Sequence, residues 1–407
     1  MNPFLTMDDF DFKDKTVLVR VDFNSPLDPE TKRILDDTRI RRHARTLEEL
    51  SEKGAKVVVM AHQGRPGSPD FSTLEQHAQV LAEILGKRVE YVDDIFGDKA
   101  KDAIRGLRSG EILILENVRA WKDERAKKKA EEHAESDLVQ NLAPLADIYI
   151  NDAFAAAHRA HASLVGFTPV LPSAAGRVME RELDALGRVA RAEERPCVYV
   201  LGGAKADDAA AITDYVLTKG TADYVLTGGV IANLFLHAAG HNLGDRNIKY
   251  LEKEELIQFV PKIQELLKRF DGKILLPEDL AVEAEGRREE IALKDLPTEH
   301  PIYDIGSETI KAYSRLLMKA KIVVLNGPVG VYENDEFLAG TDGVFGAVAR
   351  KDVFSVAGGG HTVSAIEKLG LTEKFSYIST GGGALMRFLM GKVLPCVEAL
   401  ERAAARA

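Results

Sequence analysis

Cysteine is scarce in this chain, which contains only Cys197 and Cys396 among its 407 residues. Their spacing matches no metal-binding pattern and both stand in apolar surroundings, so we expect two buried, reduced thiols. Long hydrophobic runs are also missing, since no apolar stretch approaches the roughly 20 residues needed to cross a bilayer. The first residues lack a basic segment followed by an apolar core, which argues against a signal peptide. We therefore expect a cytoplasmic protein without membrane attachment.

Positive charge is not in excess either, because 54 lysines and arginines stand against 64 aspartates and glutamates, for a net charge of −10. That balance argues against a nucleic-acid partner, so any affinity for phosphate must come from a local basic patch. Two nucleotide-binding motifs, G-x-x-x-x-G-K-[ST] and G-x-G-x-x-G, are missing, which excludes a P-loop and the usual dinucleotide site. No feature of the sequence fixes the oligomeric state, and a monomer is the default expectation.

What the chain does contain is a regular alternation of β-rich apolar runs with helical segments such as Thr38–Lys53 and Leu74–Leu85. A length of 407 residues suits two domains, since single hydrophobic cores rarely exceed about 250–300 residues. Strand–helix alternation indicates parallel sheets with helices on both faces. The sequence thus predicts an α/β protein of two doubly wound, Rossmann-like domains. Pro261 should kink or split the helical pattern over Lys253–Phe270.

The domain boundary is expected between Pro169 and Pro196, near the rigid segment Thr168–Ser173. We predict a first domain over residues 1–173 and a second over 193–390, joined by a helix over 174–192 and followed by a tail over 391–407. The helix would act as a strut with hinges at its ends, and a cleft would separate the domains. The tail has the pattern of a short helix, whose docking site the sequence does not reveal.

Apolar runs in the second half of the chain end in glycine-rich turns. Ligands of parallel sheets bind outside the carboxyl ends of the strands, where glycine lets backbone N–H groups approach a phosphate. The turn Gly358–His361, which a helical pattern follows, fits this role best, although glycines also serve simply to tighten turns. The runs are Tyr199–Leu201, Tyr224–Thr227, Ile322–Asn326, Phe354–Ala357 and Ser376–Thr380.

Two ionic side chains stand close to these turns. Lys205 directly follows Gly202-Gly203-Ala204 and could place its ammonium group on a transferring phosphoryl group. Glu333 could accept hydrogen bonds from ribose hydroxyls. Each residue type is also common on solvated surfaces, and the residues alone leave both interpretations open.

Apolar runs in the first half end instead in charged and polar groups, which predicts a site of a different kind. The planar fork of arginine suits phosphate and carboxylate, and the arginines here stand where the sheet opens. Asp22 and Asn24 add acceptors and an amide donor, as a substrate hydroxyl would require. The runs are Val17–Val21, Val57–Ala61, Ile112–Leu115 and Ile148–Ile150, and the arginines are Arg39, Arg65, Arg119 and Arg159. The same segments contain the histidines His62, His158 and His161, which could equally be core or capping residues.

Taken together, these motifs resemble the phosphoglycerate kinase family over nearly the whole chain. Eight segments occur in the order in which the family carries them, and that order is far more specific than any single motif. The segments are Val17–Asn24, Ala61–Pro66, Glu116–Arg119, Asn151–Phe154, His158–Ser163, Gly202–Lys205, Asn326–Glu333 and Ser379–Gly383.

The resemblance implies 3-phosphoglycerate on the first domain and a magnesium–adenine nucleotide on the second. It implies reversible transfer of the acyl phosphate of 1,3-bisphosphoglycerate to ADP in glycolysis and gluconeogenesis. Carried over by position, the residues that the resemblance implies for triose binding are Asp22, Phe23, Asn24, Arg39, His62, Gln63, Gly64, Arg65, Arg119 and Arg159. The nucleotide ligands are Lys205, Gly228, Gly229, Gly306, Asn326, Glu333, Gly358, Gly359, Gly360 and His361, with Gly228, Gly229 and Gly306 near the adenine.

Phosphoryl transfer depends on positioning and charge stabilisation, so we expect in-line attack without a phosphoenzyme. Arg39 and Lys205 would neutralise the transferring group, helped by the N–H of Gly360, and the domains would close to bring the substrates together. Two other functions fit the same fold. The presence of both Arg39 and Lys205 disfavours a non-catalytic nucleotide- or sugar-phosphate-binding protein, and the missing G-x-G-x-x-G turn disfavours a nicotinamide dehydrogenase.

Two positions depart from the pattern of many family members. Ala209 stands where they carry a second lysine, and His361 stands where they place an aspartate that contacts the metal–nucleotide. Both changes resemble the archaeal-type branch of the family, which makes them features of lineage rather than a loss of activity. The ligands of the magnesium ion are left unassigned.

Overall fold

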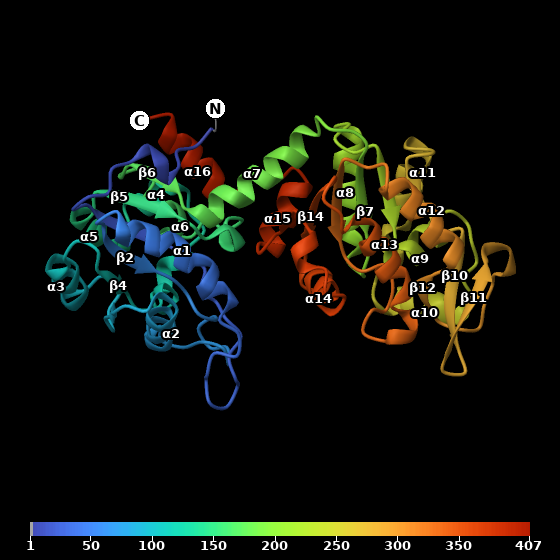
Figure 1. Cartoon of the computed structure of the whole chain (residues 1–407), viewed down its shortest axis with the longest axis horizontal. Helices are drawn as coiled ribbons and strands as arrows, with labels where there is room; N and C mark the ends of the chain where they lie inside the picture. The colour runs from blue at the N-terminus through green and yellow to red at the C-terminus, as the bar shows by residue number, and fades with distance from the viewer. Residues whose placement is uncertain (1–2) are drawn as a thin grey trace. The chain divides into compact units, whose positions relative to one another are not determined.

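The computed structural model describes residues 3–407, which form two compact units (Figure 1). One unit consists of Met1–Asp184 together with Val393–Ala407, and the other consists of Ala185–Lys392. The second unit is therefore an insertion in the chain of the first. None of the helices in residues 3–407 is long and apolar enough to span a membrane.

A six-stranded parallel sheet forms the centre of the first unit. Its strands are β1 (Thr16–Arg20), β2 (Lys56–Met60), β3 (Val89–Tyr91), β4 (Ile112–Ile114), β5 (Ile148–Asn151) and β6 (Ser173–Ala175). Their order across the sheet is β3-β4-β2-β1-β5-β6, so the direction in which the chain adds strands reverses between β1 and β5. Such a reversal opens a crevice at the carboxyl ends of the two strands.

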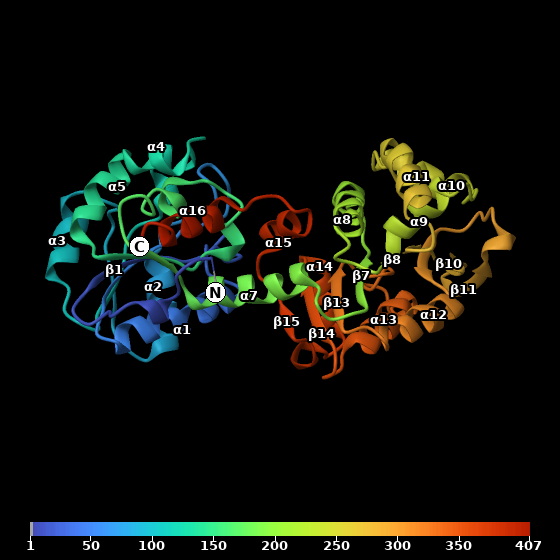
Figure 2. The same ribbon diagram turned by 90° about the horizontal axis from the view of Figure 1, so that it is seen from above.

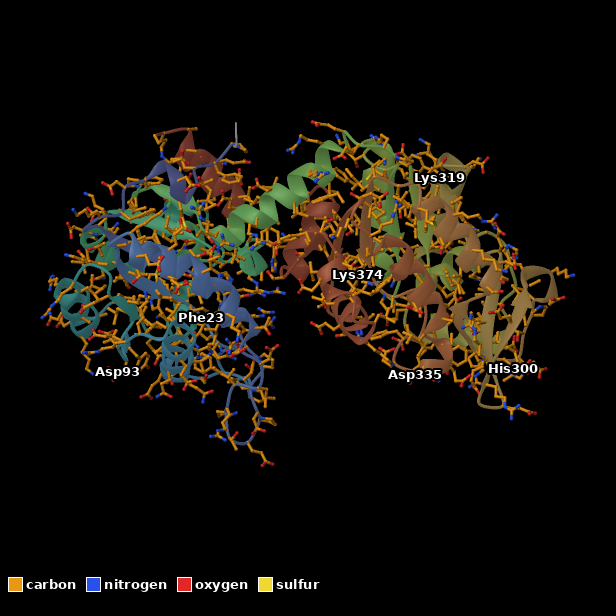
Figure 3. All side chains as sticks on the ribbon, in the orientation of Figure 1. Phe23, Asp93, His300, Lys319, Asp335 and Lys374 are labelled. Atoms are coloured by element: carbon orange, nitrogen blue, oxygen red, sulfur yellow. The ribbon has the colours of Figure 1, made fainter. Side chains whose placement is uncertain are left out.

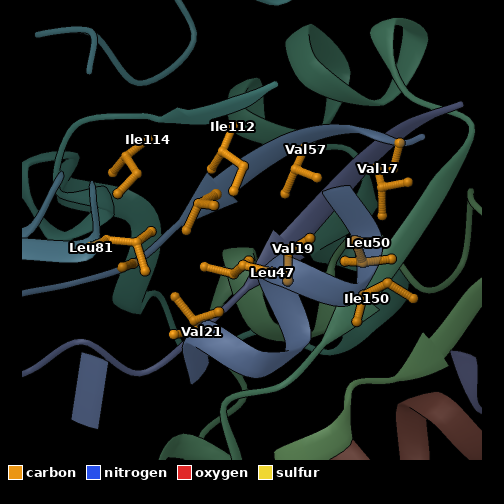
Figure 4. Packing of buried hydrophobic residues seen from close by; sticks show 14 of the residues in the cluster. Val17, Val19, Val21, Leu47, Leu50, Val57, Leu81, Ile112, Ile114 and Ile150 are labelled. Carbon is orange, nitrogen blue, oxygen red and sulfur yellow. The ribbon is translucent and has the colours of Figure 1, made fainter. Parts of the chain in front are cut away.

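Helices cover both faces of this sheet. They are α1 (Thr38–Glu52), α2 (Glu75–Leu85), α3 (Asp98–Gly106), α4 (Ala130–Ala134), α5 (Asp137–Leu142) and α6 (Ala162–Val165). Successive strand residues point to opposite faces, so Val17 packs with α1 and α2, whereas Leu18 packs with α3 and α5. Figure 4 shows Leu47 and Leu50 of α1 among the strand residues of the first of these clusters.

A second six-stranded parallel sheet forms the centre of the other unit. Its strands are β7 (Cys197–Leu201), β8 (Tyr224–Thr227), β9 (Ile274–Leu275), β13 (Ile322–Asn326), β14 (Phe354–Gly358) and β15 (Tyr377–Ile378). Their order is β15-β14-β13-β7-β8-β9, which reverses between β7 and β13. Each apolar run singled out in the sequence overlaps a strand of one of the two sheets, and the prediction of two doubly wound α/β folds is confirmed.

Helices also lie on both faces of the second sheet. They are α8 (Ala206–Thr218), α9 (Gly229–Ala238), α10 (Asp245–Lys253), α11 (Val260–Arg269), α12 (Ser307–Leu317), α13 (Ala339–Val348), α14 (Gly360–Lys368) and α15 (Gly382–Leu389). Figure 2 shows α8 and α9 on one side of the strands and α12 and α13 on the other. Pro261 does split the predicted helical pattern: α10 ends at Lys253, and Pro261 stands in the first turn of α11, where its missing N–H costs no hydrogen bond.

A small antiparallel sheet in the second unit was not predicted. It consists of β10 (Asp279–Ala284), β11 (Arg287–Ala292) and β12 (Ile302–Ile305), in the order β11-β10-β12. The strand β11 begins Arg-Arg-Glu-Glu and lies at the edge of the sheet, largely open to solvent. Its charged composition carries no hydrophobic signal of a strand, although charges are a common protection for an exposed edge.

The helix α7 (Arg177–Arg191) begins in the first unit and ends in the second. It starts later than the predicted helix over 174–192, because Ala174 and Ala175 pair with β5 as part of β6. Asp152 caps its first turn, where the carboxylate accepts hydrogen bonds from the N–H groups of Val178 (2.8 Å) and Met179 (3.3 Å).

The tail returns to the first unit as α16 (Pro395–Ala404), which packs against β6 and α6. The N–H of Cys396 donates to the carbonyl of Ala157 (3.1 Å). Cys396 and Cys197 are both buried thiols, as the sequence predicts.

Candidate active site

Three predicted loops of the first unit meet around Gly64, beyond the carboxyl ends of β1, β2 and β4. The side-chain oxygen of Asn24 accepts a hydrogen bond from the N–H of Gly64 (2.7 Å), and Arg119 Nη1 donates to its carbonyl (2.5 Å). Gly64 has a φ of +66°, and a Cβ there would lie 2.5 Å from the backbone of Asp70. Only glycine suits this position, so the loops are held together through bare backbone.

The side chain of Gln63 is buried and occupied within the protein. Its amide nitrogen donates to the carbonyls of Ser25 (2.9 Å) and Asp70 (3.0 Å), and its oxygen accepts from the N–H of Ser25 (2.9 Å). The ring of Phe23 is also fully buried, stacked on His77 with centroids 6.4 Å apart, inside the first unit (Figure 3). Gln63 therefore shapes the loops, and Phe23 can offer a ligand only its backbone.

Arg39 stands in the first turn of α1 and reaches the loop that follows β1. Its Nη1 donates to Asp22 Oδ2 at 2.6 Å. The side chain of Arg39 remains 42% exposed, whereas that of Asp22 is only 5% exposed. Asp22 therefore orients the guanidinium and leaves its other nitrogens available to a ligand. Arg65, on the loop after β2, is exposed.

Positive charge accumulates at this site. Burial, with the nearby charges of Arg159 and Arg20, lowers the pKa of Arg119 to about 10. Burial also lowers the pKa of Arg159, although Asp22 opposes the shift, and the charges of Arg65 and Arg20 add to it. Cations that disfavour one another in this way would be stabilised by a bound anion.

Two histidines at this site, His62 and His161, are uncharged near neutral pH. Burial, followed by the charge of Arg20, lowers the pKa of His62 well below its ordinary value and that of His161 to about 3. Nε2 of the third histidine, His158, lies 3.3 Å from Nε of Arg159. The structure thus brings the predicted histidines and arginines of this half together at one edge of the sheet.

A cavity of about 730 Å³ lies in the second unit, where the loops after β7, β13 and β14 meet. It also borders the first turns of α9, α14 and α15. Most of the predicted nucleotide ligands line this cavity, whereas Gly228, Gly306 and Gly358 do not. Those that line it are Lys205, Gly229, Asn326, Glu333, Gly359, Gly360 and His361.

Several glycines near the cavity are required by packing. A Cβ on Gly202 would lie 2.1 Å from the carbonyl oxygen of Pro328, and one on Gly327 would lie 2.2 Å from the carbonyl oxygen of Gly202. The loops after β7 and β13 therefore touch backbone to backbone. At the three positions outside the cavity lining, a Cβ would lie 2.0–2.4 Å from a packed side chain, namely Val329 for Gly228, Asp279 for Gly306 and Leu385 for Gly358.

Gly360 is open, in contrast to those positions, whereas a Cβ on Gly359 would lie 3.1 Å from Asn326 Oδ1. Gly359 has a φ of +94°, and a Cβ on Gly360 would meet no atom within 4 Å. Because α14 begins at Gly360, its unpaired N–H groups and the positive end of its dipole border the cavity. Lys205 precedes the first turn of α8, is exposed, and forms no ion pair among the described residues.

His361 lies beside Glu333 at the cavity edge. Its Nδ1 is 3.2 Å from the hydroxyl of Tyr332 and 3.6 Å from Glu333 Oε1. Both side chains are largely exposed, at 79% for His361 and 58% for Glu333. Within the described part of the chain, Glu333 is the one carboxylate among the residues that line the cavity.

Comparison with known proteins relates the chain to one family. A sequence model described as phosphoglycerate kinase matches residues 7–392. The phosphoglycerate kinase of Methanobacterium bryantii is 50% identical over 98% of this chain and 97% of its own length. The chain belongs to the phosphoglycerate kinase family. Its kinship with archaeal members is supported by the phosphoglycerate kinase of Methanothermobacter thermautotrophicus, which is 51% identical over the same shares of the two chains.

Solved structures of phosphoglycerate kinases have the same fold. The crystal structure from Pyrococcus horikoshii OT3 is 43% identical, with a TM-score of 0.88 over 99% of this chain and 100% of that one. The structure from Coxiella burnetii is 30% identical, with a TM-score of 0.86 over the same shares.

As a member of this family, the chain is a phosphotransferase with a carboxyl group as acceptor. It transfers a phosphoryl group reversibly between 1,3-bisphosphoglycerate with ADP and 3-phosphoglycerate with ATP, a step of glycolysis. The predicted function is confirmed, and the non-catalytic alternative is not favoured.

Much of the cavity wall was missed by the sequence analysis. These residues lie on α9, on α10 and at or directly before β12, whereas the sequence analysis sought ligands in the turns after the sheet strands. Among these residues, Tyr250 has an exposed aromatic ring, which could stack on a planar ligand. The residues are Asn233, Arg246, Tyr250, Leu251, Pro301 and Tyr303.

The described residues suit a magnesium ion that arrives on the nucleotide. Among residues 3–407, no three His, Cys, Asp or Glu side chains gather closely enough to hold a metal ion. Mg²⁺ is commonly bound by one or two carboxylates together with substrate phosphates. Glu333 is available for that purpose at the cavity, and the remaining ligands would be phosphate oxygens and water.

Proposed function

We propose that residues 1–173 bind 3-phosphoglycerate through the arginines at the carboxyl ends of the first sheet. The observation that carries this proposal is the concentration of guanidinium groups, in which Arg119 faces Arg159 and Arg20 with Asp22 and Glu124 as the nearby opposing charges. A small acid with a carboxylate and a phosphate would supply the missing negative charge, and arginine binds both groups in bidentate fashion. Asp22, Asn24 and Gly64 hold the loops in place for it.

We propose further that residues 193–390 bind the adenine nucleotide in the cavity. The N–H groups of Gly359 and Gly360, with the positive end of α14, would hold the phosphates. Lys205 would approach the terminal phosphate, and Glu333 the ribose or the magnesium ion. Gly228, Gly306 and Gly358 would support the walls from behind, with the adenine against the apolar side of the cavity.

In this proposal the reaction needs no covalent intermediate. The carboxylate oxygen of the triose attacks the terminal phosphorus of ATP in line, and the bond to the leaving oxygen of ADP breaks. Arg39, Lys205 and the N–H of Gly360 neutralise the charge on the transferring group. Magnesium, when bound with the nucleotide, offsets further phosphate charge. Residues 174–192 connect the two sites, while residues 391–407 complete the first unit.

Replacing the two cationic side chains tests these roles. Arg39→Ala and Lys205→Ala should each lower kcat by about 10²–10³-fold, the effect of losing one preformed group that stabilises developing charge. Arg45→Ala on α1 and Lys219→Ala at the end of α8 are matched controls, because both side chains are exposed and remote from the predicted ligands. The measurement is a coupled assay of ATP consumption with 3-phosphoglycerate. Near-native turnover in either test variant would rule out its assigned role.

A monomeric state, a cytoplasmic location and the lack of a nucleic-acid partner stay predictions of the sequence. Sedimentation of the purified protein with and without substrates would test the first of these. The expected result is one species with the mass of a single chain, 44.6 kDa.

A further inference from the structure

A buried chain of polar side chains runs behind the arginine site, from Glu124 to His62. Glu124, on the 3-10 helix Lys122–Arg125, is fully buried, and its carboxylate accepts from the N–H of Ser163 (2.9 Å) and from the Ser163 hydroxyl (2.5 Å). The same hydroxyl accepts from Arg20 Nε at 2.8 Å. Arg20 is fully buried as well, and its Nη2 lies 3.0 Å from Nδ1 of His62.

These contacts permit one assignment of protons. A guanidinium group only donates hydrogen bonds, so Nδ1 of His62 must accept from Arg20 and carry no proton. The neutral ring then carries its proton on Nε2. At the other end, the Ser163 hydroxyl donates its single hydrogen to Glu124, and its oxygen accepts the hydrogen bond from Arg20 Nε. Arg20 is further fixed by a bond from Nη1 to the carbonyl of Val21.

We propose that Glu124, Ser163 and Arg20 are positioning residues that hold His62 as the neutral Nε2–H tautomer, so that Nε2–H donates to an oxygen of the triose. This inference rests on the proposed binding of 3-phosphoglycerate beside His62. It gives His62 a role that the arginines cannot fill, because the ring offers one directed donor without adding charge. The triose oxygen that it contacts would be recognised by direction rather than by electrostatic attraction.

The surroundings of His62 support a ring that stays neutral. The charged groups that face it are Arg20 on β1, Arg119 on the loop after β4 and Arg159 on the loop after β5, and the remaining titratable neighbour is His161. A proton on Nδ1 would place a cation against Arg20 at 3.0 Å. Burial and these charges lower the pKa of His62 well below its ordinary value. Glu124 compensates Arg20 but reaches His62 only through Ser163 and Arg20.

The tautomer can be observed directly in the full-length protein. With ¹⁵N-labelled histidine, the NMR signals of His62 in the wild type should show protonated Nε2 and bare Nδ1, with no titration between about pH 5.5 and 8. His62→Gln identifies the signals. Protonated Nδ1 in the wild type, or a titration in that range, would overturn the proposal whatever the enzymatic activity is.

Ser163→Ala tests the relay, since it removes the link between Glu124 and Arg20. We expect a mixture of His62 tautomers, and a KM for 3-phosphoglycerate raised about three- to tenfold, as for the loss of one hydrogen bond. The KM for ATP should not change. Ser51→Ala is the matched control, because it also removes a buried hydroxyl of the first unit, bonded to Gly110 and Lys87. It should leave the His62 signals and both KM values unchanged.

The outcomes separate this proposal from the proposed function. Unchanged His62 signals and unchanged triose KM in Ser163→Ala would reject the relay while leaving the triose site intact. The expected tautomer together with an active Arg39→Ala would reject the proposed site roles and leave the relay standing. If Ser163→Ala does not fold, Glu124→Gln, which keeps the shape of the side chain, is judged by the same spectra.

Discussion

Residues of the same type can have different structural roles, and two glycines of the second unit show this. Gly202 lies where two loops touch, since its Cβ would meet the carbonyl oxygen of Pro328 at 2.1 Å. Gly360 stands in open space at the start of α14. A side chain at the first position would force the backbone to move, whereas a methyl group at the second would occupy only the space in which the proposed nucleotide places a phosphate.

Alanine at these two glycines should therefore change different properties, namely stability at Gly202 and nucleotide affinity at Gly360. Gly202→Ala should lower the free energy of unfolding by about 2–3 kcal/mol, because it forces an overlap that the loops must relieve. Gly360→Ala should leave unfolding unchanged within about 0.5 kcal/mol. It should instead raise the KM for ATP, since the methyl group obstructs the approach of phosphate to the N–H groups. Denaturant unfolding and steady-state kinetics measure the two effects, and equal stability of the two variants would refute this division.

Sequence reasoning could not have separated these glycines. Both follow an apolar run and both precede a helix, so the local pattern is the same, and only the tertiary contact of Gly202 with Pro328 distinguishes them. The same limit explains the placement of Gly306, which packs on Asp279 instead of lining the cavity. The location of the arginines could be predicted more readily. A charged side chain next to the end of a buried strand is excluded from the core, so it lies at the carboxyl edge of the sheet.

Among the elements, α7 starts with an arginine that pairs with three carboxylates. Arg177 in its first turn donates to both carboxylate oxygens of Glu49 on α1 (2.6 and 2.9 Å) and to both of Asp8 (2.6 and 3.0 Å). It also pairs with Glu180 one turn later at 2.8 Å. Bidentate pairs of this kind fix direction as well as charge, so the arginine ties the helix to two other segments of the first unit.

Stability should depend on pH through this cluster. Hydrogen bonding to Arg177 lowers the pKa of Glu49 to about 2, and that of Asp8 is also lowered. A carboxylate with a depressed folded-state pKa contributes stability above its unfolded pKa, about 4.3 for glutamate, and loses it as the pH falls toward the folded value. Arg177→Met should thus cost about 1 kcal/mol at pH 7 and progressively less from about pH 4.5 to 2.

The control for this experiment is Arg181→Met, which removes an exposed arginine from the same helix. Denaturant unfolding at pH 7, 5 and 3 gives the difference between each variant and the wild type. For Arg177→Met this difference should shrink as the pH is lowered, whereas for Arg181→Met it should stay near zero. A constant difference across the three pH values would show that the arginine stabilises by packing alone.

The elements also differ in how well they could be foreseen. The buried strands of both sheets were predictable because burial on two faces demands continuous apolar runs, as in β1 and β13. The edge strand β11 was not, because its exposed backbone is protected by charged side chains that look like a loop. The start of α7 was misplaced because Ala174 and Ala175 suit a helix but pair in β6, where the neighbouring strand outweighs local preference.

On the scale of the whole molecule, the chain closes the first unit with its last helix. Leu400 of α16 is fully buried, and Arg406 donates to the carbonyl of Thr168 (2.5 Å). The thiol of Cys396 lies 3.6 Å from the carbonyl oxygen of Arg159. The helix α16 therefore contacts the backbone of Arg159, which is one of the residues proposed to bind the triose. The second unit lies wholly between these two parts of the first unit in sequence and has a core of its own.

Weakening α16 should consequently damage one unit and spare the other. Leu400→Ala should destabilise the first unit by about 2–4 kcal/mol through loss of buried apolar contact, and it should raise the KM for 3-phosphoglycerate through Arg159. Hydrogen exchange measured by mass spectrometry would locate the effect: peptides of the first unit should exchange faster, while those of 185–392 should keep the wild-type rate. Arg402→Ala, which removes the exposed ion pairs of Arg402 with Glu398 on the same helix and with Glu131 on α4, should change neither. Faster exchange throughout both units would instead show that the two cores unfold as one cooperative body, and that closure of the first unit by α16 stabilises the whole chain.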